Sequence, residues 1–213
     1  MAKTPAACSR RALLALPLIA WGGSALAARG KVVTILGDSI TAGLGLPAGQ
    51  ALPAQLHQAL NRRGVANVVR GAGVSGDTTA GGAARVDFSV QPDTAVVVVA
   101  LGGNDLLLGT EPRVVRANLD RILNRLQARR MDVVLAGIHA PPEIGRRYAQ
   151  EFNAVFPAAA KAHHVTFYPN LLAGVARNPK LNQADGLHPN AAGVRVIAER
   201  LAPVVAKVLA TRP

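Results

Sequence analysis

The sequence predicts an α/β fold, a three-layer α/β/α sandwich on a five-stranded, parallel, doubly wound sheet in flavodoxin-like order. Short apolar runs alternate five times with longer segments of helical periodicity, the pattern of parallel strands joined by right-handed crossovers. The runs are continuously apolar, as in strands buried on both faces. Polar turns follow the first and third runs, where an open sheet places its ligand sites.

Five segments are predicted to be strands. They are residues 32–36, 65–69, 95–101, 131–138 and 165–168. The third is the clearest, because β-branched valines fill most of it. The second is expected to end before a glycine-rich loop that covers residues 71–79.

The segments between the strands repeat apolar residues every three or four positions, as amphipathic helices do. Helices are expected at residues 50–63, 111–130 and 147–163, in a weak segment ending near residue 86, and in a last segment reaching about residue 209. Thr110 is a candidate cap for the 111–130 helix. Pro157 should end or kink its helix, and Pro203 should kink the last one.

Residues 1–27 have the three parts of an export signal: basic residues, an apolar stretch over 12–21 and an A-x-A-like cleavage site at 25–27. The apolar stretch is shorter than the roughly 20 residues of an ordinary transmembrane helix. Arg10-Arg11 suits both an ordinary secretory and a twin-arginine signal, so both routes stay open. Residues 28–213 are expected to form one domain without a membrane span, in the periplasm or secreted.

Composition narrows the classes of function. Hydrophobic residues make up 50% of the chain, which excludes a disordered protein. Aromatic residues make up only 3%, which argues against a nucleic-acid-binding site that works by stacking bases on aromatic rings. The net charge of +12 becomes +9 without the signal. It could attract polyanions, but its basic residues are scattered, which favours an ordinary solvated surface. Cys8 lies within the signal, so a thiol nucleophile is excluded from the mature chain.

Four short segments carry candidate chemistry. They are Gly37-Asp38-Ser39, Ser75-Gly76-Asp77, Gly102-Gly103-Asn104-Asp105 and Asp185-Gly186-Leu187-His188-Pro189. Each alone suits a turn, a cap or a loop. In this order the four resemble the blocks of the SGNH hydrolases, the GDSL esterase family. The similarity is to the bacterial periplasmic branch of arylesterases, acyl-CoA thioesterases and lysophospholipases, and runs from about Val32 to the last helix.

The residue types fit a serine hydrolase. Ser39 offers a hydroxyl, which needs an adjacent base to become a good nucleophile. His188 is the candidate base, and Asp185 could accept its other ring N–H and fix the tautomer. The resemblance further implies an oxyanion hole formed by the backbone N–H groups of Ser39 and Gly76 and the side-chain amide of Asn104. No metal and no cofactor are expected.

Three consecutive leucines, Leu106, Leu107 and Leu108, follow the Asn104 block and are expected on a loop. Either two of them fill the core beneath the next helix, or at least one lines an acyl groove beside Ser39. Gly43-Leu44-Gly45-Leu46 is a candidate for the opposite wall.

The predicted function is therefore an exported serine esterase and thioesterase for short- to medium-chain acyl esters, working through an acyl-enzyme on Ser39. Two alternatives stay open: a carbohydrate O-acetyl esterase and a non-catalytic, basic polyanion-binding protein. The expected partners are small acyl esters or thioesters, with lipid as an option and nucleic acid not expected. The chain should be a monomer or a weak oligomer.

Overall fold

The computed structural model describes residues 1–2 and 30–211 of the 213-residue chain. All but the first two residues of the predicted export signal, including Cys8, therefore lie outside the described residues. Among the residues described, no helix combines the length and the apolar character required to cross a membrane.

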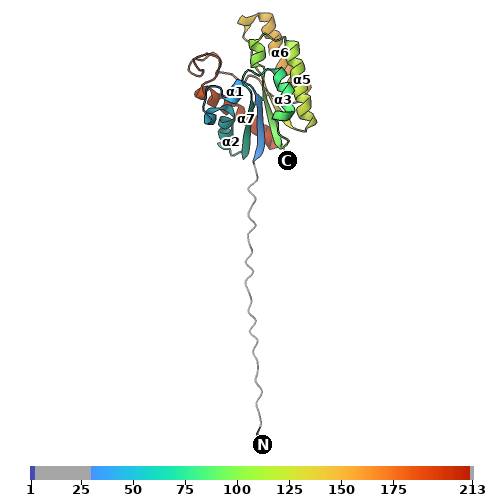
Figure 1. The fold of residues 1–213 in the computed structure, drawn as a ribbon, viewed down its shortest axis with the longest axis vertical. Coiled ribbons are helices and arrows are strands. Elements are labelled where there is room, and N and C mark those ends of the chain that lie inside the picture. Colours follow the sequence, from blue (N-terminus) through green and yellow to red (C-terminus); the bar gives the residue numbers. More distant parts are fainter. Residues whose placement is uncertain (3–29, 212–213) are drawn as a thin grey trace.

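The centre of the fold is a five-stranded sheet in the order β2-β1-β3-β4-β5, and every neighbouring pair is parallel (Figure 1). The strands are β1 (Lys31–Gly37), β2 (Asn67–Gly73), β3 (Thr94–Ala100), β4 (Asp132–Ala136) and β5 (Thr166–Tyr168). This order is the one predicted. All seven residues of β3 are buried, as expected for a central strand covered on both faces.

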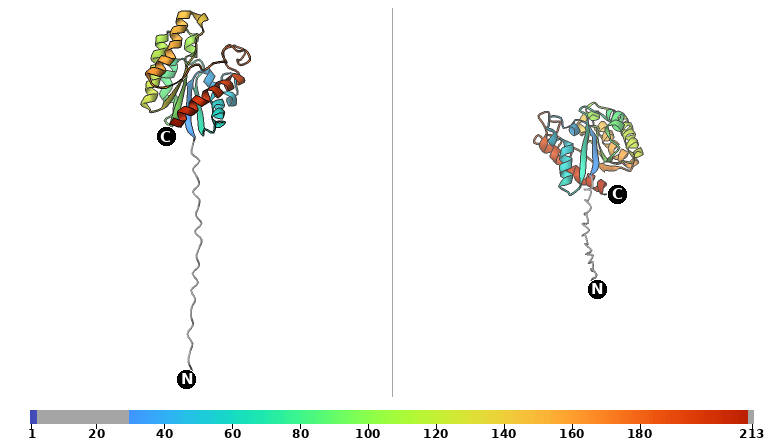
Figure 2. Two further views of the ribbon diagram at one scale, coloured as in Figure 1. Left: turned by 180° about the vertical axis from the view of Figure 1, so that it is seen from behind. Right: turned by 60° about the horizontal axis from the view of Figure 1, so that its bottom comes forward.

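Helices cover both faces of the sheet, which confirms the three-layer fold class. They are α1 (Ser39–Ala42), α2 (Leu52–Asn61), α3 (Thr79–Ser89), α4 (Gly103–Leu107), α5 (Pro112–Ala128), α6 (Arg146–Ala162) and α7 (Ala191–Thr211), with short 3-10 turns η1 (Ala48–Gln50) and η2 (Pro142–Ile144). α2 and α7 pack together on one side, and α3, α5 and α6 pack in a row on the other (Figure 1). Seen from behind, α7 crosses the face of the sheet (Figure 2).

The long helices bury the predicted apolar stripes. α7 turns its predicted inner residues to the core, and all of them are buried: Val194, Ile197, Leu201, Val205 and Val208. α6 and α7 continue through Pro157 and Pro203, so the first of the two expectations for Pro157, that it ends its helix, is wrong. Pro112 lies in the first turn of α5, and Thr110 does not cap this helix, because the N-cap position belongs to Glu111.

β2 is longer than predicted, because it continues through Gly71–Gly73, which were expected to be loop. These residues pair in parallel register with the end of β1, and Gly37 lies opposite Gly73. A side chain at Gly73 would bring a Cβ atom within 2.4 Å of the Ala42 nitrogen and 2.7 Å of the Asp38 oxygen. Glycine is thus required here by the close packing of α1 on the strand, and it does not mark a loop.

The register brings three strand ends to one edge of the sheet. Gly37 at the end of β1 lies opposite both Gly73 of β2 and Ala100 of β3. The segments that follow these three strands carry Ser39, Gly76 and Asn104, respectively. The fold therefore brings three of the four sequence blocks side by side at the carboxyl end of the sheet.

Candidate active site

Ser39 is the first residue of α1 and directly follows the strand-end turn at Asp38. The Asp38 carboxylate caps this short helix by accepting the backbone N–H of Ile40 at 3.0 Å. Ser39 is only 7% exposed, yet it lines a cavity in the protein. The buried strand and the cap together fix the hydroxyl in place.

His188 and Asp185 approach Ser39 from the C-terminal part of the chain, and His188 lies 149 positions after Ser39 in the sequence. The Ser39 Oγ atom lies 2.9 Å from Nε2 of His188, and Nδ1 of His188 lies 2.6 Å from Oδ2 of Asp185. The other oxygen of Asp185 accepts the backbone N–H groups of Leu187 and His188, at 2.9 and 3.0 Å. One carboxylate therefore fixes both the loop and the ring of the histidine.

The pKa values of the two carboxyl groups near the serine, Asp185 and Asp38, are shifted in opposite directions. The hydrogen bonds from the His188 ring and from the Leu187 and His188 backbone lower the pKa of Asp185 to about 2. Burial raises the pKa of Asp38 to about 6, although its bond to Ile40 acts in the other direction. Asp185 therefore stays a carboxylate at any pH near neutral. Asp38, in contrast, gains a proton at a pH just below neutral.

Gly76 lies in a four-residue turn that is closed by the Asp77 N–H, which donates to the Val74 oxygen at 3.1 Å. Its φ of 81° is a left-handed conformation that suits glycine at the third position of such a turn. A Cβ atom at Gly76 would meet no atom within 4 Å, so its backbone is open to the cavity that it lines.

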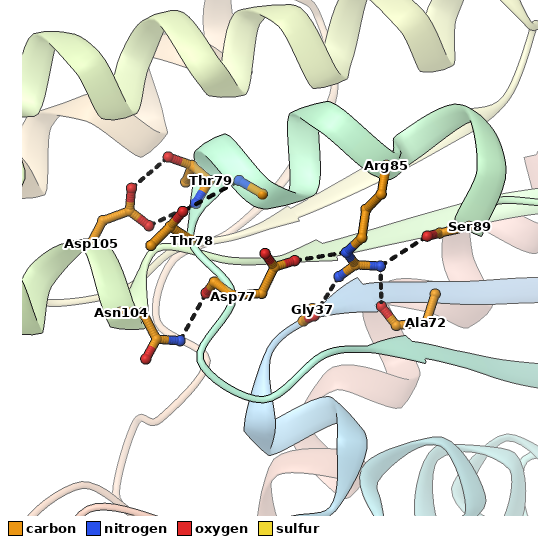
Figure 3. A network of polar contacts seen from close by, with 10 residues as sticks. Gly37, Ala72, Asp77, Thr78, Thr79, Arg85, Ser89, Asn104 and Asp105 are labelled. Carbon is orange, nitrogen blue, oxygen red and sulfur yellow. Dashed lines mark hydrogen bonds and ion pairs between the residues drawn. The ribbon is translucent and has the colours of Figure 1, made fainter.

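Asn104, on α4, lines the same cavity as Ser39 and Gly76. Its Nδ2 donates one hydrogen bond to the backbone oxygen of Asp77 at 2.8 Å (Figure 3). An amide nitrogen carries two hydrogens, so a second donor is left for a ligand. The bond to Asp77 ties the amide of Asn104 to the Gly76 turn.

Behind these donors lies a polar network that the sequence reading missed (Figure 3). Asp105 is 1% exposed and accepts both the backbone N–H and the hydroxyl of Thr79, at 2.8 and 2.6 Å. Arg85, on α3, bonds to Asp77 and to the ends of β1 and β2. The signal in the sequence that could have revealed this network is Arg85 itself. It is an arginine among small residues, in a segment with weak helical periodicity, eight positions after Asp77.

The cavity has a volume of about 630 Å³ and a largely apolar lining. The apolar side chains lining it include Ile40, Leu44, Leu106, Leu107, Ile138 and Leu172. Leu44, from the segment expected to form the opposite wall, is therefore part of the lining. An apolar cavity with a few polar groups beside a serine suits an acyl chain.

The leucine segment differs from the expectation in two respects. Leu106 and Leu107 belong to α4, so the prediction that all three leucines lie on a loop is wrong. Leu106 packs against the core, Leu107 is 60% exposed at the cavity, and Leu108 is 72% exposed and does not line the cavity. Successive residues of a helix point in directions about 100° apart, so three in a row cannot face one wall.

The chain is similar in sequence to known hydrolases. Residues 35–196 match the GDSL-like lipase/acylhydrolase family. The chain belongs to this family. It is 36% identical over 183 residues to esterase TesA of Pseudomonas aeruginosa, covering 85% of this chain and 91% of that protein. It is also 36% identical over 177 residues to thioesterase 1/protease 1/lysophospholipase L1 of Escherichia coli K12, covering 83% and 84%.

The likeness extends to the three-dimensional fold. The crystal structure of AlinE4, an SGNH-hydrolase family esterase, matches with a TM-score of 0.71 and 41% identity, covering 86% of this chain and 98% of that one. The family and fold expected from the four sequence blocks are thus confirmed, and the chain is a hydrolase that acts on ester bonds. Within residues 1–2 and 30–211, no three His, Cys, Asp or Glu side chains cluster in a way that could hold a metal ion.

Proposed function

We propose that this protein is an exported serine esterase and thioesterase for short- to medium-chain acyl substrates, and that it works through an acyl-enzyme on Ser39. One observation carries the proposal: the continuous contact from Ser39 Oγ through the His188 ring to Asp185, beside an apolar cavity. A nucleophile, a base and a group that orients the base are the three parts that acyl transfer by a serine requires.

In the proposed reaction, Ser39 Oγ attacks the substrate carbonyl carbon while Nε2 of His188 accepts the hydroxyl proton. The tetrahedral intermediate collapses and expels the alcohol or thiol, which takes this proton from the imidazolium. Water then attacks the acyl-enzyme with His188 again as base, which releases the carboxylic acid and restores Ser39. Asp185, ionised throughout, stabilises the imidazolium in both steps.

The backbone N–H groups of Ser39 and Gly76 and the free amide hydrogen of Asn104 are the proposed oxyanion donors. All three residues line the cavity. Donors fixed in advance stabilise the charge that develops on the carbonyl oxygen, and they therefore act on the transition state more than on substrate binding. The bond from Asn104 to Asp77 holds one of these donors in place before substrate arrives.

The proposed substrate class follows from the cavity. Its apolar lining favours an acyl chain over a sugar, which would call for more polar partners. Arginines form ion pairs at separate places on the surface, such as Arg62 with Glu199, Arg70 with Asp93 and Arg177 with Glu143. This distribution favours a solvated surface over a polyanion-binding site. The export signal in residues 1–27 supports a periplasmic or secreted location.

Labelling with a fluorophosphonate probe, which reacts with activated serines, tests the proposal. The wild-type protein should be labelled, and Ser39→Ala should not. This variant should lose on the order of 10³-fold or more of ester hydrolysis, because triad members act as a unit, while its melting temperature stays near that of wild type. Absence of labelling in the folded wild-type protein would favour the polyanion-binding alternative. Hydrolysis of acetylated sugars alone would favour the O-acetyl esterase.

A further inference from the structure

We infer that Arg85 is a positioning residue for the oxyanion hole: it holds the Gly76 turn against the end of β1 and touches no substrate itself. The inference rests on the proposed function, because it assigns to Arg85 the task of fixing the proposed donors. Arg85 does not line the cavity, so any effect on hydrolysis has to pass through the residues that it binds.

The guanidinium group of Arg85 contacts the ends of two strands and the active-site turn (Figure 3). Its Nε donates to Oδ2 of Asp77 at 2.7 Å. Its Nη1 donates to the Ala72 backbone oxygen at 2.9 Å and to Ser89 Oγ at 3.0 Å. Its Nη2 donates to the Gly37 backbone oxygen at 2.8 Å. Four of the five guanidinium N–H donors are thus used, and three of the four acceptors belong to active-site segments or their strands.

This pattern links the two backbone donors of the proposed oxyanion hole. Gly37, whose oxygen accepts from Arg85, lies two residues before Ser39. The same oxygen accepts the backbone N–H of Val74 at 3.1 Å, and Val74 opens the turn that contains Gly76. One carbonyl therefore joins the nucleophile turn, the glycine turn and the arginine.

Asp77 connects this arrangement to the third donor. Its carboxylate binds Arg85, while its backbone oxygen accepts the amide of Asn104. The other carboxylate oxygen lies against α3, where a Cβ atom at Gly81 would come within 1.7 Å of it. The absence of a side chain at Gly81 leaves room for this carboxylate, and Arg85 and Asn104 hold Asp77 from two sides.

The ion pair between Arg85 and Asp77 is largely buried. The side chains of Arg85 and Asp77 are 18% and 10% exposed, so both charges are largely withdrawn from water. Removing one partner of such a pair leaves the other uncompensated, and the segment that carries it shifts to regain water. Here the free partner would be Asp77, next to Gly76. Lysine could reach Asp77 but cannot offer the planar fork that also serves both backbone oxygens.

The test is a kinetic comparison of Arg85→Lys, Arg85→Met and Asp77→Asn with wild type, well below each melting temperature. We expect kcat to fall about 10- to 100-fold in Arg85→Met, because a misplacement of about 1 Å can cost a factor of 10². KM should stay within about threefold, and Arg85→Lys should recover part of the loss. Labelling of Ser39 by the fluorophosphonate should slow together with kcat.

Arg116→Met is the matched control, because Arg116 pairs with Asp120 at 2.8 Å and is likewise partly buried. It should change the melting temperature at most and leave kcat as in wild type. Variants at Arg85 that only melt earlier, with wild-type kcat in the folded protein, would overturn the inference. If Arg85→Met does not fold, Asp77→Asn decides the matter by the same readout. Failure of the wild-type protein to label or to hydrolyse esters would instead overturn the proposed function.

Discussion

Asp185 binds His188 twice: one carboxylate oxygen lies 2.6 Å from the ring Nδ1, and the other accepts the backbone N–H at 3.0 Å. These bonds, with the one from the Leu187 backbone, keep the pKa of Asp185 at about 2. The carboxylate is therefore ionised wherever the protein is folded under ordinary conditions. Any loss of activity on mild acidification has to arise from another group.

The first prediction concerns this acid limb. Histidine is the side chain whose charge ordinarily changes between pH 5 and 8, and a protonated His188 cannot accept the Ser39 proton. kcat/KM should therefore fall as the pH drops through the range in which histidine ordinarily gains its proton, and the slope should approach about tenfold per pH unit. The limb should persist in Asp38→Asn, which removes the carboxyl next to the serine whose pKa is about 6. A flat profile down to pH 4 would contradict a histidine base.

The second prediction concerns stability. Burial raises the pKa of Asp38 from 3.8 to about 6, so the folded protein favours the protonated form. The stability from this group is fully present below about pH 4 and is lost as the pH rises through 6. The free energy of unfolding of Asp38→Asn, relative to wild type, should therefore rise by about 2 to 3 kcal/mol from pH 4 to pH 8. Urea unfolding across this range measures the difference, and a difference independent of pH would refute the prediction.

The third prediction concerns Asn104→Ala. Loss of one oxyanion donor should lower kcat by roughly 10²- to 10³-fold, with a change in KM of a few-fold at most. Steady-state kinetics on one activated ester measures both values. A large rise in KM at constant kcat would mean that the amide binds ground-state substrate. The lost bond to Asp77 should also reduce stability, by about 1 kcal/mol.

The fourth prediction concerns chain length. Each buried methylene contributes about 0.8 kcal/mol, so kcat/KM should rise roughly fourfold per substrate carbon until the cavity is full. Leu107→Ala should flatten this rise, and Leu106→Ala should flatten it and also lower the melting temperature, since Leu106 packs on the core. Leu108→Ala is the control, because Leu108 does not line the cavity, and it should keep the wild-type profile. If all three variants keep the wild-type chain-length profile, α4 does not line the acyl site.

The sheet order and the position of the site were accessible from sequence, because buried parallel strands are continuous apolar runs and parallel strands end at a common edge. The valine run of β3 and the polar turns after β1 and β3 carried that information. The extension of β2 was not accessible. Gly71 and Gly73 have low strand propensity, and their pairing with β1 depends on contacts distant in sequence.

Arg85 was missed for a related reason. A single arginine in a helix is ordinarily solvent-exposed, and nothing local reveals that its side chain turns inward to backbone oxygens of two strands. The helical placement of Leu106 and Leu107 was missed because α4 has only five residues and no side-chain cap. Segments this short owe their conformation to the surrounding fold rather than to propensity.

The separation of 149 positions between Ser39 and His188 has a consequence for biosynthesis. A chain still on the ribosome presents the serine early, but His188, the proposed base, reaches Ser39 only after the loop before α7 has been made and has docked. On the proposed mechanism, unfinished chains and fragments cut before Asp185 should therefore be catalytically silent. For the same reason, the fraction of chains that a serine-directed probe labels counts the molecules whose two ends have come together.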